Sequence, residues 1–100
     1  MFPIARFRVE DRSMEPTLAA GDYVLVNRWS YRVGRPMKGD VVVLRDPEAP
    51  RRHLVKRIAD VSVSGAYVVG DNAQPSRDSR AFGRVPRHLI VGRVWRSARP

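Results

Sequence analysis

Short apolar segments separated by turn-forming residues are the feature that most limits how this chain can fold. No stretch of ten residues or more has the apolar spacing of a helix. Six segments instead combine β-branched or aromatic residues with alternation or a short apolar run. The predicted strands cover residues 5–9, 23–26, 41–44, 53–63, 66–69 and 89–95. Short strands at this spacing predict an all-β fold, either a small folded antiparallel sheet or a partly open barrel.

The segments between these strands are predicted to be turns and loops. Residues 11–20 contain Pro16 and predict a turn or a single helical turn, and residues 29–36 predict a loop. Ser64-Gly65 has the composition of a hairpin turn. Residues 70–80 are polar and form a long loop for a chain of 100 residues, and long structured loops often carry function.

Length and composition exclude several classes of protein. A chain of 100 residues predicts one domain, residues 1–100, with a core of its own. The absence of cysteine excludes a disulfide scaffold, a cysteine zinc site, an iron–sulfur cluster and a thiol nucleophile. The longest apolar run, Val41–Leu44, is far shorter than the roughly 20 residues of a membrane span, and no secretory signal sequence is recognisable.

The basic residues are almost all arginines. Nineteen Lys and Arg against ten Asp and Glu give a net charge of +9, which suits nucleic acid or an anionic membrane surface. Only Lys38 and Lys56 are lysines. Because a buried lysine can lose its proton whereas arginine stays charged, both lysine positions are of interest, although codon usage alone accounts for such a bias.

Ser13 and Lys56 are candidates for chemistry, each with a plainer alternative. Ser13 precedes Pro16 in a constrained turn that can expose a serine nucleophile beside its own backbone N–H, or can use the serine only as a turn residue. Lys56 lies in the apolar segment 54–58. Pointing inward it would have a lowered pKa and could act as a general base; pointing outward it would be an ordinary strand lysine.

The segment 70–83 is a third candidate. It contains glycines, Asn72, two aspartates and Ser76, a composition typical of a tight, internally hydrogen-bonded loop. A hydroxyl such as that of Ser79 could hydrogen-bond a lysine amine and orient it. The alternative is a solvated loop without a chemical role.

Taken together and in this order, the three segments resemble the catalytic core of the type I signal peptidases, which are Ser–Lys peptidases. The resemblance covers about residues 9–95. It depends on Ser13–Leu18, the Gly21-Asp22 and Gly39-Asp40 turns, Lys56–Ile58, the box from Gly70 to Gly83, and the later Val85-Pro86 and Ile90–Arg93.

The resemblance implies a role for each matching residue. Ser13 would be the nucleophile, its backbone N–H one oxyanion donor, Lys56 the general base, and Ser79 the residue that orients the lysine. Four residues would brace the loop against the site: Asp71, Asn72, Asp78 and Arg80. The mechanism needs no cofactor and no metal. His53 and His88, the only histidines, are interpreted as surface residues rather than members of a Ser-His-Asp triad.

Three departures from the family pattern stand out. Many members carry a small or hydroxyl residue where this chain has Asp11, and an ionised carboxylate cannot donate to an oxyanion. Either Asp11 points away, for instance toward an arginine, or the second oxyanion donor comes from elsewhere. A hairpin replaces the second β domain that large members insert between Lys56 and Gly70. Twelve residues precede Ser13 and five follow Trp95, so we expect a piece of a longer protein or a member without a span.

The expected partner is an extended polypeptide with small residues before the cut, bound by strand addition to an enzyme that we expect to be monomeric. The resemblance implies membrane association on the extracytoplasmic face. The N-terminal segment, with Phe2, Ile4 and Phe7 beside Arg6 and Arg8, could rest on anionic lipid, although a plain first strand is favoured.

Four alternatives stay open. One is a soluble, cytoplasmic protease of the kind that matures nickel superoxide dismutase. The others are a self-cleaving repressor-type Ser–Lys protease, a catalytically degenerate barrel, and a basic β-barrel that binds nucleic acid. The last is disfavoured because the arginines are spread along the chain without an aromatic-rich binding stretch.

Overall fold

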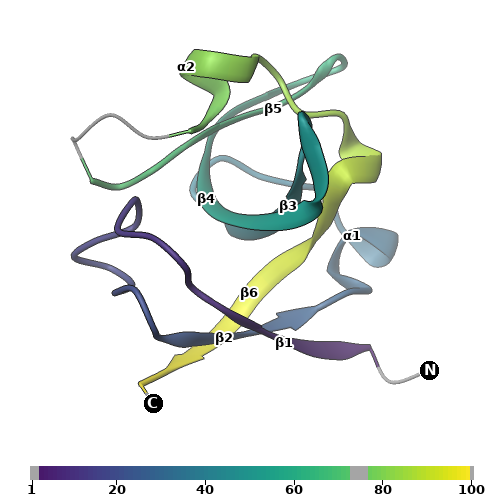
Figure 1. Ribbon diagram of the computed structural model, residues 1–100. Helices are drawn as coiled ribbons and strands as arrows, with labels where there is room; N and C mark the ends of the chain where they lie inside the picture. Colours follow the sequence, from purple (N-terminus) through teal and green to yellow (C-terminus); the bar gives the residue numbers. More distant parts are fainter. Residues whose placement is uncertain (1–2, 73–76, 100) are drawn as a thin grey trace.

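The computed structural model describes residues 3–72 and 77–99, and its main element is one six-stranded antiparallel sheet (Figure 1). The strands are β1 (Ile4–Arg8), β2 (Tyr23–Asn27), β3 (Val41–Asp46), β4 (Ala49–Ser62), β5 (Gly65–Val69) and β6 (Ile90–Ala98). The all-β prediction is therefore confirmed, in the form of a folded sheet.

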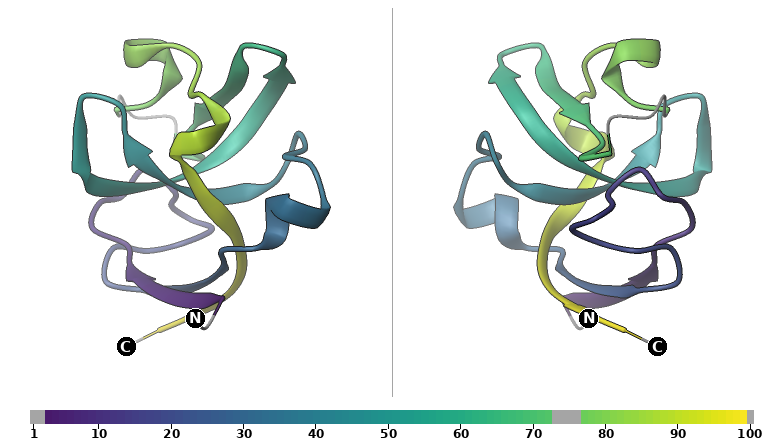
Figure 2. Two further views of the ribbon diagram at one scale, coloured as in Figure 1. Left: turned by 90° about the vertical axis from the view of Figure 1, so that its right-hand side faces the viewer. Right: turned by 90° about the vertical axis from the view of Figure 1, so that its left-hand side faces the viewer.

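The sheet folds around β6, which joins two halves of the molecule (Figures 1 and 2). The strand order is β1-β2-β6-β3-β4-β5, so β6 pairs with β2 on one side and with β3 on the other. Gly92 permits this crossing, because a Cβ at that position would lie 2.4 Å from the backbone oxygen of Asn27. Within the described residues β1 and β5 remain the two outer strands, and the sheet does not close into a barrel.

Helical structure in residues 3–72 and 77–99 is limited to single turns. α1 (Ser30–Val33) lies in the segment that was predicted to be a loop, and α2 (Ser79–Phe82) lies at the end of the predicted 70–80 loop. A 3-10 turn, η1 (Arg87–Leu89), precedes β6. Turns this short have no apolar periodicity of their own, so the sequence pattern does not reveal them.

The central hairpin differs in detail from its prediction. β4 begins at Ala49 rather than at residue 53, because the chain turns back tightly after Asp46 and pairs Asp46 with Ala49. Gly65 is the first residue of β5 rather than part of the turn. It has a φ of +130°, and a Cβ there would lie 2.3 Å from the backbone oxygen of Val85.

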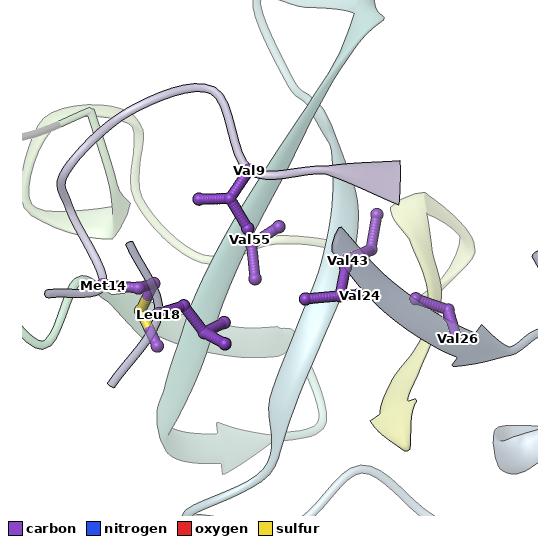
Figure 3. Close-up of a cluster of buried hydrophobic side chains, with 7 residues drawn as sticks. All are labelled: Val9, Met14, Leu18, Val24, Val26, Val43 and Val55. Atoms are coloured by element: carbon purple, nitrogen blue, oxygen red, sulfur yellow. The ribbon is translucent and has the colours of Figure 1, made fainter. Parts of the chain in front are cut away.

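Two apolar clusters form the core, one in each half of the fold. The cluster next to the Ser13 turn joins residues of the turn to residues of three strands (Figure 3). Its buried members are Val9, Met14, Leu18, Val24, Val26, Val43 and Val55. The second cluster lies between β3, β4 and β5 and comprises Val42, Leu44, Leu54, Ile58, Ala66, Val68 and Val85.

The N-terminal segment forms the first strand of the sheet, as favoured from the sequence. Its pairing with β2 runs from Ile4↔Asn27 to Arg8↔Tyr23. Phe2 lies outside the described residues. In the part of the chain that the structure covers, no helix combines the length and apolar character needed to cross a bilayer.

Candidate active site

Ser13 lies on a compact turn between β1 and β2, and apolar side chains of this turn pack into the core. Met14 and Leu18 are buried in the core cluster shown in Figure 3, and the Leu18 amide donates to the Met14 carbonyl at 2.9 Å. The peptide bond between Glu15 and Pro16 is cis. Burial of the next residue, Met14, fixes the turn against the sheet and leaves Ser13 at its edge, with 6% of its surface exposed.

The loop after β5 holds the same turn from the other side. The Asn72 amide donates to the Ser13 carbonyl at 2.8 Å, and the Asn72 side chain donates to the Arg12 carbonyl at 2.9 Å. Gly70 lies so close that a Cβ there would be 2.5 Å from the Ser13 carbonyl oxygen and 3.1 Å from the Ser13 Cβ. Only glycine fits this contact without a displacement of the Ser13 backbone.

Lys56 lies on β4, the strand next to the outer strand β5, and is fully buried. It pairs with Val42 of β3. On the opposite side of β4, the ladder with β5 ends at Arg57↔Val69, so Lys56 and Gly70 are the next residues at that end. Gly70 therefore links the two candidate residues, because it contacts Ser13 and follows the strand that pairs beside Lys56.

The Lys56 amine and the Ser13 hydroxyl share an unusual property. Among the described residues, only two buried side-chain polar atoms have no hydrogen-bond partner, Ser13 Oγ and Lys56 Nζ. Burial lowers the pKa of Lys56 from its ordinary value of 10.5, against the opposing effect of the Asp11 and Asp78 carboxylates, while Arg80 and Arg52 lower it further. Of the two alternatives for Lys56, the structure has the one in which the side chain points inward.

Of the two alternatives for Asp11, the structure does not have the one in which its side chain points away from the site. Its Oδ1 accepts the backbone N–H of Ser13 at 3.0 Å. Partial burial raises its pKa, but this hydrogen bond, the neighbouring Ser13 hydroxyl and the charges of Lys56 and Arg52 outweigh that effect, and the pKa is lowered overall. A carboxylate two residues before an amide can close a local turn with it. The backbone N–H of Ser13, which was predicted to be an oxyanion donor, thus donates to Asp11 in this structure.

The start of α2 places Ser79 and its neighbours beside the site. The buried Ser79 hydroxyl oxygen accepts the Val68 amide at 2.8 Å, and no hydrogen bond joins it to Lys56 in the described part of the chain. Asp78 caps α2 by accepting the Arg80 amide at 3.0 Å, and it also accepts the Gly70 amide at 3.1 Å. Arg80 pairs with Asp78 at 2.7 Å. Ser76 lies outside the described residues.

Asp71 is the centre of a contact network that sequence reasoning identified only in part. Arg57 donates to both of its carboxylate oxygens at 2.8 Å, and Thr17 donates to Oδ2 at 2.6 Å. The same arginine donates to the Gly39 carbonyl at 2.9 Å. The network ties the lysine strand, the serine turn and the loop together. Alternation along β4 could have indicated Arg57, since its side chain must point away from that of Lys56.

The histidines contribute no second constellation. His88 is exposed, whereas His53 is half-buried with its ring centroid 4.8 Å from that of Phe7, and burial and Arg45 lower its pKa. His88 thus has the predicted surface position, and His53 is only partly exposed. In the described ranges neither histidine hydrogen-bonds to a carboxylate or to Ser13, and no three His, Asp or Glu side chains gather as a metal site would require.

Comparison with known proteins gives consistent matches. The family model for signal peptidase, peptidase S26, matches residues 1–65 and 59–97. The mitochondrial ATP-independent inner membrane protease subunit 1b of Arabidopsis thaliana is 39% identical, over 84% of this chain and 64% of the relative. The mitochondrial inner membrane protease subunit 1 of Mus musculus is 33% identical, over 83% and 62%. Signal peptidase I of Pseudomonas fluorescens is 33% identical, over 81% and 30%.

The chain spans less than two thirds of the length of each of these three relatives. The family match nevertheless covers nearly the whole of this chain, including both the Ser13 turn and the Lys56 strand. The resemblance expected from the sequence is confirmed, and the chain belongs to the signal peptidase family, peptidase S26.

Proposed function

We propose that this chain is the catalytic core of a serine endopeptidase that removes N-terminal signal or pro-segments from other proteins. The observation that carries the proposal is the pair of buried, unpartnered atoms, Ser13 Oγ and Lys56 Nζ. Leaving one buried polar group without a partner costs about 1–3 kcal/mol of folding stability. A purely structural role does not explain why the fold keeps two such groups. Family membership and the lowered pKa of Lys56 support the same interpretation.

Acylation would use the neutral Lys56 amine as the general base. Nζ accepts the hydroxyl proton of Ser13 while Oγ attacks the scissile carbonyl carbon, which gives a tetrahedral oxyanion and a charged lysine. The lysine returns that proton to the leaving amine as the peptide bond breaks. Ser13 is then held as an ester with the N-terminal part of the substrate.

Deacylation would repeat the proton transfers with water. Lys56 accepts a proton from water as the oxygen attacks the ester carbonyl, and the proton then goes to Ser13 Oγ as the ester bond breaks. Desolvation is what makes the base competent near neutral pH, since a solvent-exposed lysine would stay charged. We propose that Ser79 orients Lys56 during this cycle, and that Asp71, Asn72, Asp78 and Arg80 hold the loop.

The substrate would bind as an extended strand beside β4. Residues 53–55 of β4 pair only with β3, because β5 begins its pairing at Arg57. Phe7 contacts His53, and Val9 shares the core cluster with Val55, so the segment that leads to Ser13 lies close to residues 53–55 of β4 (Figure 3). An added strand there would approach Ser13, which favours recognition through main-chain hydrogen bonds.

The cellular setting is proposed from the relatives alone. Two of them are named as mitochondrial inner membrane proteases and a third as a signal peptidase I, which supports a substrate processed at a membrane. A soluble maturation protease would use the same site on a different pro-segment. The two proposals therefore differ in substrate and not in mechanism.

The test is peptide cleavage between pH 6 and pH 10, with substrates that carry small residues before the cut. Wild type should cleave, with activity that rises through a pKa below the ordinary 10.5 of lysine. Ser13→Ala and Lys56→Met should each lose at least about a thousandfold in kcat, as expected when a nucleophile or its base is removed. A signal-type and a soluble pro-segment peptide, compared with and without lipid, distinguish the two settings.

Lys38→Met is the matched control, because Lys38 is the only other lysine and is exposed. It should cleave like wild type. Activity retained in Lys56→Met, or no cleavage by folded wild type, would overturn the proposed mechanism. In the second case, salt-dependent binding of single-stranded DNA would support the nucleic-acid alternative.

A further inference from the structure

Asp11 occupies a backbone group that the proposed reaction needs. Its carboxylate accepts the Ser13 N–H at 3.0 Å, in a local turn of three residues. An oxyanion formed on the carbonyl that Ser13 attacks would need free N–H donors directed at it. While the Asp11 carboxylate accepts the Ser13 N–H, this donor is not available to an oxyanion. The oxyanion would have to displace the carboxylate, which is also negatively charged.

The same carboxylate acts on the general base. Asp11 and Asp78 are the two carboxylates that raise the pKa of Lys56, whereas burial, Arg80 and Arg52 lower it. The interaction is mutual, because Lys56 and Arg52 lower the pKa of Asp11. A negative charge near a buried amine favours its protonated form, which cannot accept the proton of Ser13.

The Ser13 turn does not depend on Asp11 for its shape. Asn72 donates to the Ser13 carbonyl, the Glu15 amide donates to the Arg12 carbonyl at 3.1 Å, and Met14 is fully buried. Gly70 packs directly against the Ser13 backbone. These contacts anchor the turn on both sides, so removal of the Asp11 carboxylate should free the amide without displacing the serine.

From this arrangement we propose that Asp11 is a positioning residue that restrains the enzyme, because its carboxylate occupies the Ser13 amide and places a negative charge within reach of the Lys56 amine. The proposal rests on the proposed Ser–Lys function. It predicts a gain of activity on substitution, which is the opposite of what a merely supporting turn residue would give.

Two substitutions separate the two effects. Asp11→Asn removes the charge but keeps a side-chain oxygen that can accept the Ser13 N–H, whereas Asp11→Ala removes both. Both variants should move the acid limb of the kcat profile to lower pH, by about one unit. Asp11→Ala should in addition raise kcat on the alkaline plateau by about three- to tenfold, since one freed oxyanion donor is worth up to about a hundredfold. KM should change less than kcat.

A readout independent of cleavage comes from the Lys56 side chain itself. In a Ser13→Ala background, which cannot react, NMR titration of the lysine Cε signals should show a lower Lys56 pKa with Asp11→Asn than without it. Lys38 supplies a reference signal in the same sample. Glu10→Gln is the matched control, because Glu10 is an exposed carboxylate next to Asp11 and should change neither the titration nor the rate.

The outcomes distinguish the two proposals. If wild type cleaves and Asp11→Ala is slower with an unchanged acid limb, Asp11 only supports the turn and the restraint is refuted. If no form cleaves but the Lys56 titration still shifts, the proposed function fails while the electrostatic coupling stands. Faster cleavage by Asp11→Ala, together with a shifted titration in Asp11→Asn and not in Glu10→Gln, supports the restraint.

Discussion

The two candidate catalytic residues are held in different ways. Ser13 lies on a turn that is fixed by directed contacts: the hydrogen bond from the Asn72 amide to its carbonyl and the close approach of Gly70. Lys56 lies on β4, paired through its backbone with Val42 of β3, and its buried amine has no partner in the described residues.

This difference matches the roles that we propose for the two residues. A nucleophile needs its position defined to within a fraction of an ångström, and hydrogen bonds and steric contacts do this well. A lysine base needs above all a lowered pKa, and burial achieves this without a specific partner. We therefore expect the Ser13 region to be sensitive to small changes of geometry and the Lys56 region to be sensitive to changes of charge.

Among substitutions outside Ser13 and Lys56, the largest effect should follow from Gly70→Ala. The new Cβ would lie 2.5 Å from the Ser13 carbonyl oxygen, so the Ser13 turn must move. We expect kcat per folded molecule to fall about a hundredfold, since a shift of about 1 Å can cost that much. Overpacking should also lower the free energy of unfolding by about 1–3 kcal/mol. Cleavage assays and denaturant titration of the same samples measure the two effects.

Gly92→Ala is the matched control, with an equally close backbone contact where β6 pairs with β2 rather than at the Ser13 turn. Its Cβ would lie 2.4 Å from the Asn27 carbonyl oxygen, where β2 and β6 cross. It should lose similar stability but keep its activity per folded molecule. An equal loss of activity in both glycine variants would mean that the Ser13 turn has no special sensitivity to geometry.

Asp71→Asn should have the next largest effect, because Asp71 joins the serine turn to the lysine strand. The ion pair with Arg57 is partly exposed, with 35% of the Arg57 side chain and 16% of the Asp71 side chain accessible, so solvent screening limits the loss of stability to about 1 kcal/mol. We expect kcat to fall about tenfold as Thr17 and Arg57 lose a common partner.

The pH dependence of this loss has a definite sign. Arg57 lowers the pKa of Asp71 below its ordinary 3.8, so the stabilisation is complete above that pH and is lost as the pH falls through the folded-state pKa. Wild type and Asp71→Asn should therefore converge in acid. Asp60→Asn, which breaks the more exposed pair with Arg84, should change stability less than Asp71→Asn does and leave cleavage intact.

The sequence predicted the serine, the lysine and the strands around them, but not the contacts between them. Alternation and turn residues located the strands because they report burial and backbone shape locally. The contact of Gly70 with Ser13 depends on how distant segments meet, and no local pattern encodes that. The bond from the Ser13 amide to Asp11 is local, but the sequence showed only the charge of Asp11 and left the direction of its side chain open.

Lys56→Met should show that the Lys56 region is sensitive to charge: it should raise the free energy of unfolding while it abolishes activity. Because burial lowers the Lys56 pKa, the folded state carries a penalty that is largest when the amine is protonated in both states. The variant should be more stable than wild type at neutral pH, by about 1.4 kcal/mol for each unit of pKa lowering. The difference should shrink as the pH rises toward 10.5, where the unfolded chain also loses the proton. A constant difference from pH 6 to pH 10 would contradict a buried, titrating lysine.

Thr17→Val should give the smallest effect and test how finely the Ser13 turn is held. Thr17 donates to Asp71 Oδ2 at 2.6 Å from an exposed position, and valine keeps its shape without the hydroxyl. We expect a loss of about 0.5–1 kcal/mol in unfolding free energy and a two- to threefold lower kcat, because Arg57 still holds both oxygens of Asp71. Thr17→Ser restores the hydroxyl and should recover most of both. If Thr17→Val reduced kcat as strongly as Asp71→Asn, the threonine bond rather than the arginine pair would be what fixes the turn, and the network would act on Ser13 directly instead of through the lysine strand.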